Sequence, residues 1–321
     1  MRASPLLYPL GLLAAAPAAL AQATQIPFTG DAALDLRLVT FNIRYDTSNR
    51  DPGEQPWWET RCASNPAACR MPHIVHQLRH IINAAPNSAS TLIGLQEAFA
   101  NQITDVVLNL GKSWQYIGDG REGGNRGEHC PILYDADAVE VLHERTRWLS
   151  DTPEVSSSYR GIGPPRVVTI GVFRDLATGE RFIHANTHLE AWDANARAAQ
   201  IQIALSQISV VQAVWGGLPI TLSGDFNTEP GHDAHLVLVD SGYMRELWDL
   251  AGSSRREGLT DGTWTTFSQG ERAQRLDYIW LGVNGRSTWE TRGYEIIDNV
   301  VDGVFISDHR AVVGDIRLSQ A

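Results

Sequence analysis

The stretch Leu218–Pro230 reads LPITLSGDFNTEP and joins a buried strand to a pair of polar side chains. Ile220 and Leu222 belong to an apolar run, which predicts a short strand that breaks at the following Ser-Gly pair. Asp225 and Asn227 come directly afterwards, two residues apart. Residues i and i+2 of an extended chain project from the same face, so a carboxylate and a carboxamide are expected side by side where the strand ends.

Strand-like segments of this kind recur along the chain. They are short, rich in Val, Ile, Leu and Thr, and bounded by Gly, Pro, Asn or Asp, which is typical of strands. The segments cover 36–45, 91–98, 131–135, 166–175, 181–189, 219–226, 276–282 and 310–318. Two of them, 166–175 and 181–189, are joined through an Ala-Thr-Gly link and predict an antiparallel hairpin.

Helical periodicity separates the strand clusters. It is clearest from Ala194 to Trp215, where apolar residues recur three or four positions apart. Further helices are predicted over His73–Ala85 and Ala98–Leu110. Helices between strand clusters indicate an α/β layered protein. Because the strands come in pairs as well as singly, two packed sheets with helices outside fit better than a purely parallel sheet.

The N-terminus has the composition of a secretory signal. Residues 1–21 hold one Arg, an apolar stretch and a small-residue Ala-Leu-Ala series before the expected cleavage site. A membrane anchor is the alternative, but two prolines interrupt an apolar run that is shorter than the roughly 20 residues a span needs. We therefore expect a secreted, extracellular protein without a membrane span, and a single domain over residues 30–320.

The charge and lysine content argue against several functions. Lys and Arg total 26 against 37 Asp and Glu, with no basic stripe, so a stable nucleic-acid partner is not expected. Acidity still permits a metal-assisted enzyme that acts on phosphates, since a cation supplies local positive charge. Lys112 is the only lysine, which argues against Schiff-base chemistry and a GxxxxGK phosphate loop.

The chain holds three cysteines. Cys62 and Cys69 bracket the short insert CASNPAAC, and in a secreted chain we interpret them as a local disulfide. A zinc site is the weaker alternative, because no His or second Cys pair stands at the usual spacing. Cys130 lies beside an apolar run and is interpreted as a buried thiol rather than a nucleophile.

Most of the apolar strands carry polar groups near one end. These groups are Asn42, Glu97, Asn186, His188, Asp225, Asn227, Asp277, Asp308 and His309. Taken singly, each has a structural explanation, such as a turn, a helix cap or a hydrogen-bonded core histidine. Together they supply the oxygen ligands that Mg²⁺ prefers and histidines suited to proton transfer near neutral pH. The combination indicates metal-assisted hydrolysis.

The ordered motifs TFNIRY, LQEA, NTHLE, GDFN, RLDYIW and SDHRAV, spread over about residues 36–318, resemble the endonuclease/exonuclease/phosphatase superfamily. Single motifs are common, whereas the ordered set is specific. GEHCPILY and NTHLEAWDANAR are similar to a secreted or bacterial branch whose substrates are poorly defined. The resemblance implies a deoxyribonuclease I-like four-layer α/β sandwich, in which two packed mixed β-sheets are flanked by helices and the site lies at the strand ends.

The resemblance also implies a metal site that takes Mg²⁺ (or Mn²⁺). Glu97 would be the principal ligand, with Asn42 and Asp308 in support. Asp225 and Asn227 would orient the attacking water and the phosphate, and they are candidates for holding a second metal ion.

Proton transfer is the second implied task. His309, oriented by Asp277, would be the general base, although in some members of the superfamily the Asp of GDFN is proposed for that role. His188 would contact the phosphate as an acid or transition-state stabiliser, with Asn186 beside it.

Arg166, Arg197 and Glu128 are secondary candidates for substrate binding. Each arginine lies near the start of an element and would present a fork to a phosphate. A surface pair between Arg197 and Asp193 is an equal alternative. Glu128 would reach a sugar hydroxyl or a second cation. An aromatic rim is a further hypothesis, with ordinary packing as its alternative, for Trp57, Trp58 and Trp264.

The leading hypothesis is a secreted, Mg²⁺-dependent hydrolase of phosphate esters that acts as a monomer on a phosphorylated small molecule. A secreted deoxyribonuclease I-like endonuclease, with nucleic acid as substrate, shares every core residue and is the first alternative. A non-catalytic secreted binding protein on the same fold is the second alternative, since a fold does not determine function.

Overall fold

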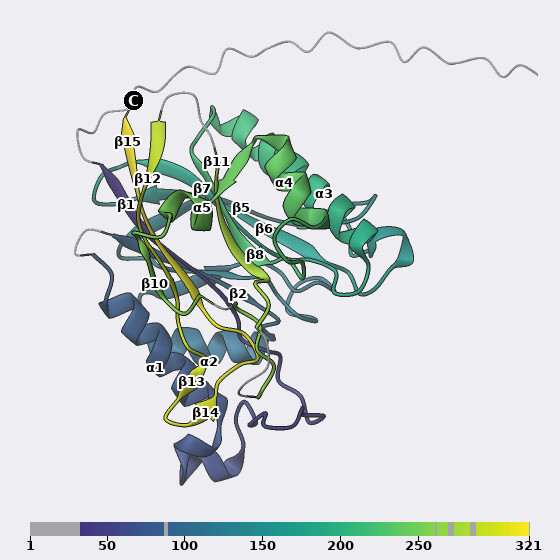
Figure 1. The fold of residues 1–321 in the computed structure, drawn as a ribbon, viewed down its shortest axis with the longest axis vertical. Coiled ribbons are helices and arrows are strands. Elements are labelled where there is room, and N and C mark those ends of the chain that lie inside the picture. The colour runs from purple at the N-terminus through teal and green to yellow at the C-terminus, as the bar shows by residue number, and fades with distance from the viewer. Residues whose placement is uncertain (1–32, 87–88, 261, 269–272, 283–286, 321) are drawn as a thin grey trace, which may run out of the picture.

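The computed structural model describes residues 33–320, apart from 87–88, 261, 269–272 and 283–286. The predicted signal peptide over 1–21 therefore lies outside the described residues. Within these residues the strands form two large sheets and a small two-stranded ribbon, and helices cover the outer faces of the large sheets (Figure 1).

The first sheet is mixed. Its strands, in spatial order, are β10 (Arg256–Gly258), β12 (Ser287–Ile296), β15 (Val312–Gln320), β1 (Leu34–Asn42), β2 (Ser90–Gln96), β4 (Ile132–Asp135) and β3 (Trp114–Ile117). At its centre β1 pairs parallel with β2 and antiparallel with β15. The first and last predicted strands of the chain thus become neighbours.

The second sheet is also mixed. Its spatial order is β5 (Val139–Trp148), β6 (Val167–Asp175), β7 (Arg181–His188), β8 (Ile220–Asp225), β11 (Asp277–Gly282) and β9 (Met244–Glu246). β6 and β7 pair antiparallel, which confirms the predicted hairpin. β7 and β8 pair parallel, and the connection between them is the long helix α3 (Ala194–Trp215), whose bounds match the prediction.

Three apolar cores separate the layers. Alternate side chains of β1 divide between two of them, as a strand buried on both faces requires. Leu36 and Leu38 pack toward the second sheet, whereas Val39 and Phe41 pack under α1 (Arg70–Asn83) and α2 (Ala100–Leu110). The third core lies between the second sheet and the pair α3 and α4 (Asp233–Ser241). The four-layer α/β sandwich is therefore confirmed.

Smaller elements complete the described chain. They are α5 (Leu247–Ala251), the ribbon strands β13 (Val300–Val301) and β14 (Val304–Phe305), and the 3₁₀ turns Thr60–Ala63, Pro66–Ala68 and Tyr159–Gly161. The first two turns lie in the cysteine insert, where a disulfide joins Cys62 and Cys69 and confirms their predicted pairing. None of the helices in the described ranges combines the length and the apolarity that crossing a bilayer requires.

Two predicted strands end earlier than expected. The segment 36–45 stops at Asn42, and the segment 91–98 stops at Gln96. In both cases a residue just beyond the strand has left-handed backbone, with φ of 56° at Arg44 and 58° at Glu97. A left-handed residue cannot continue a β-ladder, so the chain turns where its polar side chains begin.

Candidate active site

Strand register brings the central polar residues together. His188 ends β7 and is the register partner of Asp225 at the end of β8. Asp225 is in turn the partner of Asp277, the first residue of β11. Because register partners lie directly across from one another, a histidine and two carboxylates stand in a row at one edge of the second sheet.

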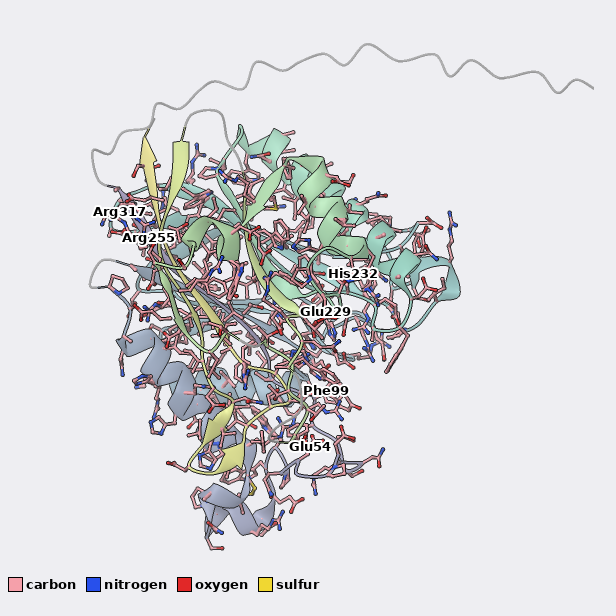
Figure 2. All side chains as sticks on the ribbon, viewed as in Figure 1. Glu54, Phe99, Glu229, His232, Arg255 and Arg317 are labelled. Atoms are coloured by element: carbon pink, nitrogen blue, oxygen red, sulfur yellow. A yellow bond between two sulfur atoms is a disulfide. The ribbon has the colours of Figure 1, made fainter. Side chains whose placement is uncertain are left out.

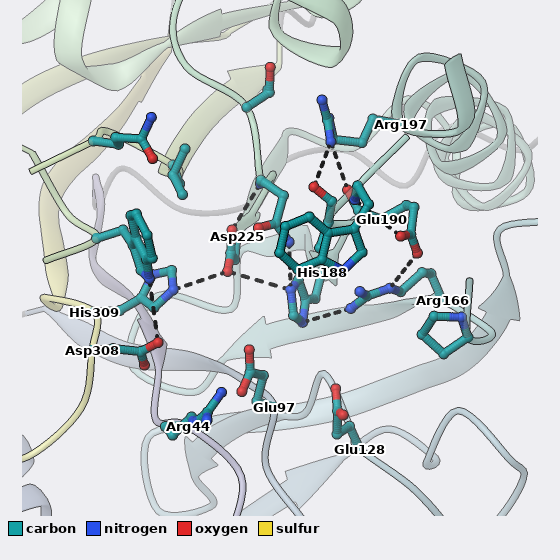
Figure 3. Close-up of a pocket in the computed structure, with 18 of the residues that line it drawn as sticks. Arg44, Glu97, Glu128, Arg166, His188, Glu190, Arg197, Asp225, Asp308 and His309 are labelled. Carbon is teal, nitrogen blue, oxygen red and sulfur yellow. Dashed lines mark hydrogen bonds and ion pairs between the residues drawn. The ribbon is translucent and has the colours of Figure 1, made fainter. Parts of the chain in front are cut away.

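Asp225 is the hub of this row (Figure 3). Its Oδ2 accepts a hydrogen bond from Asn42 Nδ2 at 2.9 Å and lies 3.5 Å from His188 Nε2 and 3.6 Å from His309 Nε2. Its Oδ1 accepts the backbone N–H of Asn227 at 2.9 Å. Burial raises the pKa of Asp225 to about 6 against the lowering effect of His309. The carboxylate therefore connects two imidazoles and titrates within the range where proton transfer takes place.

His309 is held by a second carboxylate. Its Nδ1 donates to Asp277 Oδ2 at 2.8 Å. Burial by itself lowers the pKa of His309, but the negative charges of Asp277 and Asp225 prevail and raise it well above the usual value. The ring is therefore an imidazolium near neutral pH, and its Nε2–H is directed toward Asp225.

His188 has the opposite environment. Its Nδ1 lies 3.1 Å from Arg166 Nη1, and its Nε2 lies 2.8 Å from the amide nitrogen of Asn227. Burial lowers the pKa of His188 well below the usual value, and the positive charge of Arg166 lowers it further. The ring is therefore neutral, and Nδ1 accepts from the guanidinium because arginine can only donate.

A group of carboxylates faces the histidines from the first sheet. Burial raises the pKa of Glu97 to about 7, and the carboxylates of Asp308 and Glu128 raise it in the same direction. Carboxylates crowded in this way favour a bound divalent cation, which replaces mutual repulsion with attraction. Glu97 and Asp308 both line the cleft described below, so they fit the predicted Mg²⁺ site.

A tighter set of ligand-type atoms belongs to Asp225, Asp277 and His309, all within 4.8 Å of one another. Asp277 is fully buried, and its Oδ2 is already bonded to His309 in an acid–histidine pair, whereas its Oδ1 has no hydrogen-bond partner among the described residues. Glu97 and Asp308, which line the cleft, stay the predicted metal ligands, and this set is a second group that could hold an ion.

Asn42 takes a different place from the one predicted. Its Nδ2 donates to Glu97 Oε1 at 3.1 Å as well as to Asp225, and its Oδ1 accepts the backbone N–H of Arg44 at 3.0 Å. In this geometry the amide nitrogen of Asn42 bridges the carboxylates of Glu97 and Asp225 beneath the site. The amide oxygen is bonded to the backbone of Arg44 and does not face the carboxylates.

The site opens into a cleft of about 820 Å³, a size suited to a small ligand. Predicted residues that line it are Glu97, Glu128, Arg166, His188, Arg197, Asp225, Asn227, Asp308 and His309. Glu229 and His232, labelled in Figure 2, line the cleft from the second-sheet side. Asn42, Asn186 and Asp277 are fully buried and lie behind the lining.

Asn186, predicted to lie beside His188 as part of the substrate-binding set, does not face the cleft. Its Nδ2 donates to the backbone oxygens of Leu95 and Pro131 at 2.7 and 2.9 Å. Its Oδ1 accepts from Gln96 Nε2 at 2.7 Å. The side chain is therefore occupied in joining the two sheets, and its burial keeps it from a ligand.

Arg197 reaches the cleft but is already engaged. Its Nε and Nη2 donate to the two oxygens of Asp233 at 2.9 and 3.0 Å. The alternative pair with Asp193 is also wrong, because Asp193 instead caps α3 by accepting the N–H of Ala196 at 2.7 Å. Arg197 thus fastens α3 to α4 at the cleft wall.

Arg166 and Glu128 both line the cleft, as their predicted role requires. Arg166 contacts His188 and lies 3.5 Å from Glu190 Oε2, while Glu128 pairs with Arg121 at 2.8 Å. Burial raises the pKa of the Cys130 thiol to about 12, which agrees with its interpretation as a buried thiol and not a nucleophile.

Several lining residues were missed from the sequence. They include Arg44, Tyr45, Arg121, Glu190 and Trp192. Arg44 and Tyr45 belong to the TFNIRY motif itself, which was a usable signal. Among the tryptophans of the predicted rim, Trp264 lines the cleft and Trp57 is buried in a core, whereas Trp58 lies outside the cleft.

A sequence model of the Endonuclease/Exonuclease/phosphatase family matches residues 39–309. The chain belongs to this family. The matched range includes every predicted catalytic and metal-binding residue. A search of curated proteins found no significant match.

Solved structures of family proteins share the fold. An endonuclease/exonuclease/phosphatase from Bacteroides vulgatus is 25% identical with a TM-score of 0.72, over 89% of this chain and 99% of that one. The mannosyl-6-phosphatase Bt3783 of Bacteroides thetaiotaomicron is 21% identical with a TM-score of 0.70, over 88% and 99% of the two chains. The human Nocturnin catalytic domain with bound sulfate is 18% identical with a TM-score of 0.62, over 89% and 95%.

Proposed function

We propose that this protein is a secreted, Mg²⁺-dependent hydrolase of phosphate esters, in which water attacks phosphorus in line. The observation that carries the proposal is the row His188, Asp225 and Asp277, set by strand register beneath a cleft that also contains Glu97 and Asp308. Family members act on phosphoesters, and the mannosyl-6-phosphatase has the same fold, which supports the reaction class.

The residues divide the work by position. Glu97 and Asp308 would hold Mg²⁺, which as a Lewis acid withdraws charge from the phosphoryl group. Asp225 takes the proton of the attacking water, because its carboxylate lies at the cleft floor between the two histidines. His309, held by Asp277, donates a hydrogen bond to the developing negative charge. His188 stays neutral beside Arg166 and positions the phosphate together with Asn227.

The test is a substrate panel run with Mg²⁺, with Mn²⁺ and with EDTA. It measures phosphate release from glycerol 3-phosphate and p-nitrophenyl phosphate, cleavage of bis(p-nitrophenyl) phosphate, and nicking of plasmid DNA. We expect metal-dependent turnover of esters, lowered by about 100-fold or more in Asp225→Asn if this residue is the general base. Asp240→Asn, an exposed carboxylate on α4, is the matched control and retains wild-type rates.

The alternatives predict other outcomes of the same panel. Plasmid nicking without turnover of small esters identifies a deoxyribonuclease I-like endonuclease. The zebrafish TDP2 structure with a single-stranded DNA product shares the fold at a TM-score of 0.60 and 14% identity, which keeps that alternative in the panel. No turnover of any phosphate substrate contradicts both enzymes and leaves the non-catalytic binding protein.

We also propose that the mature protein is secreted as a monomer. The composition of residues 1–21 and the disulfide between Cys62 and Cys69 support export to an oxidising compartment. Expression of the full chain with its N-terminus intact should yield exported protein that begins at Gln22, as read by mass spectrometry. Light scattering should give the mass of one chain, and retention of residues 1–21 in the exported protein contradicts the predicted cleavage.

A further inference from the structure

Trp192 is an exposed aromatic side chain inside the cleft. Its exposed fraction is 93%, and no other large hydrophobic side chain among the described residues is as exposed. It lies four residues after His188, on the short connection between β7 and α3, and it lines the cleft. An exposed indole lacks the favourable free energy that burial of its apolar surface would provide. A bound ligand that covers the indole would supply this free energy.

The connection that carries Trp192 is firmly held. The N–H of Trp192 donates to Glu190 Oε1 at 3.2 Å, and the N–H of Glu190 donates to Gln200 Oε1 at 2.8 Å. Arg197 Nη1 donates to the backbone oxygen of Ala191 at 3.0 Å. These bonds fix the backbone before the tryptophan, and Asp193 after it caps α3, so the chain that carries the indole is ordered before a ligand arrives.

The surroundings of Trp192 are polar, and the cleft lining is acidic, with eight carboxylates against four arginines. Each arginine that lines the cleft lies within 3.5 Å of an acidic oxygen. The pairs are Arg44 with Asp51, Arg121 with Glu128, Arg166 with Glu190, and Arg197 with Asp233. A track of unpaired basic residues, which a polynucleotide backbone needs, is therefore missing from the described lining. Carboxylates that are paired with guanidinium groups can still accept hydrogen bonds from the hydroxyl groups of a neutral ring, and the guanidinium groups can donate to them.

We infer that Trp192 is a specificity residue that stacks on the ring of the leaving group, and that the substrate class is a monosaccharide phosphate. This inference rests on the proposed function. The phosphate lies on His188, Asn227 and the metal-binding acids, and the pyranose ring extends along the β7–α3 connection. Its C–H face covers the indole, while its hydroxyl groups bond to the polar wall.

The kinetic test compares two phosphate monoesters that differ in the ring. Glucose 6-phosphate has a pyranose ring, and glycerol 3-phosphate has none. In Trp192→Ala we expect the ratio of kcat/KM for glucose 6-phosphate to that for glycerol 3-phosphate to fall about tenfold, chiefly through KM. Trp192→Phe restores most of the ratio. Trp58→Ala, at a tryptophan that is 43% exposed and outside the cleft, leaves both rates unchanged.

Two kinetic results overturn the inference. One is an equal loss on both esters in Trp192→Ala, which means that the side chain supports the loop rather than a ring. The other is a loss confined to a single-stranded oligonucleotide substrate, which means that the indole stacks on a base.

A binding measurement separates this inference from the proposed function. Calorimetric titration of glucose 6-phosphate and of glycerol 3-phosphate in the presence of Mg²⁺ uses Asp225→Asn protein, in which turnover is expected to be strongly slowed. Adding Trp192→Ala should weaken glucose 6-phosphate about tenfold more than glycerol 3-phosphate. If the wild type hydrolyses no phosphate ester but this difference is present, the proposed function fails and the ring platform stands. If hydrolysis is present without the difference, the platform is rejected alone.

Discussion

At the scale of single residues, the two histidines of the site differ in charge although they face the same carboxylate. Both Nε2 atoms lie about equally far from Asp225 Oδ2, at 3.5 Å for His188 and 3.6 Å for His309. The difference comes from the other side of each ring, where His309 meets Asp277 and His188 meets Arg166. One ring is therefore an imidazolium and the other is neutral. Asp225 thus lies between a hydrogen-bond donor that carries charge and one that does not.

The sequence motifs predicted which residues lie together at the site, but they did not predict the chemical role of each residue. The GDFN, NTHLE and SDHRAV motifs hold His188, Asp225 and His309, and the structure places all three at one cleft. The amide of Asn42 and the burial of Asn186 depend on the approach of the two sheets, which local sequence does not encode. The exposure of Trp192 in the cleft could not be predicted either, because exposure is a property of the folded surface.

Glu97 leads to a prediction about pH and metal. Its pKa of about 7 means that the carboxyl is partly protonated at neutral pH, and a protonated carboxyl is a poor ligand. Mg²⁺ affinity should therefore rise with pH through about 7 and fall by up to about tenfold per pH unit below it. Glu97→Gln should weaken binding at pH 8 by about tenfold or more and flatten this dependence. Isothermal titration calorimetry between pH 6 and pH 8 measures both effects.

Glu257→Gln is the matched control for this titration. Glu257 is an exposed residue of the edge strand β10 and takes no part in the cleft, so the variant should bind Mg²⁺ like the wild type. Unchanged Mg²⁺ affinity in Glu97→Gln would mean that the metal lies elsewhere.

At the scale of elements, burial decided which strands could be recognised from the sequence. All eight segments predicted as strands form strands, because each is apolar enough to be buried on one or both faces. The strands that were missed include β5, β10 and β12, whose sequences alternate or are largely polar. β-propensity reflects packing in the folded sheet more than local preference, so these segments carry little signal of their own.

His184 of β7 predicts how the fold responds to acid. It is fully buried, and its ring contacts the hydroxyls of Thr221 at 2.8 Å and Ser223 at 3.3 Å. Burial lowers its pKa from 6.5 to about 3. Between these values the unfolded chain binds a proton that the folded chain does not, so the free energy of unfolding falls as pH drops below 6.5. Urea unfolding at pH 7, 5 and 4 measures this loss.

His184→Asn keeps a polar side chain but removes the titrating ring. The variant should be less stable at pH 7, yet it should lose less stability than the wild type between pH 7 and pH 4. His76→Asn, at an exposed histidine of α1, should follow the wild-type curve. Parallel pH dependences in wild type and His184→Asn would show that other groups govern the acid response.

At the scale of the whole molecule, the two sheets pack through a shared core and leave one end open as the cleft. The site residues come from both sheets and from both ends of the matched sequence, so the cleft forms only when the layers are assembled. The cysteine insert lies apart from this core, between β1 and α1. Its disulfide therefore restrains a peripheral segment and not the residues of the site.

The disulfide predicts a difference in stability without a difference in mechanism. It closes a loop with a sequence separation of seven residues, and a crosslink of that length contributes about 2 kcal/mol. The double variant Cys62→Ser/Cys69→Ser should have a free energy of unfolding that is lower by that amount, measured by urea unfolding. It should retain wild-type turnover per folded molecule. Dithiothreitol should destabilise the wild type and leave the double variant unaffected. An equal response of both proteins to the reductant would contradict a role of the disulfide in stability.

The left-handed backbone at the site has a consequence for laboratory evolution. Arg44, Glu97 and Asn227 hold φ values of 56°, 58° and 50°, a conformation that costs side-chain-bearing residues roughly 1–2 kcal/mol and glycine almost nothing. A library screened only for survival at high temperature will therefore gather glycine at these three positions. These thermostable variants will have lost a predicted metal ligand or a side chain of the cleft. Thermal stability and turnover must therefore be selected together.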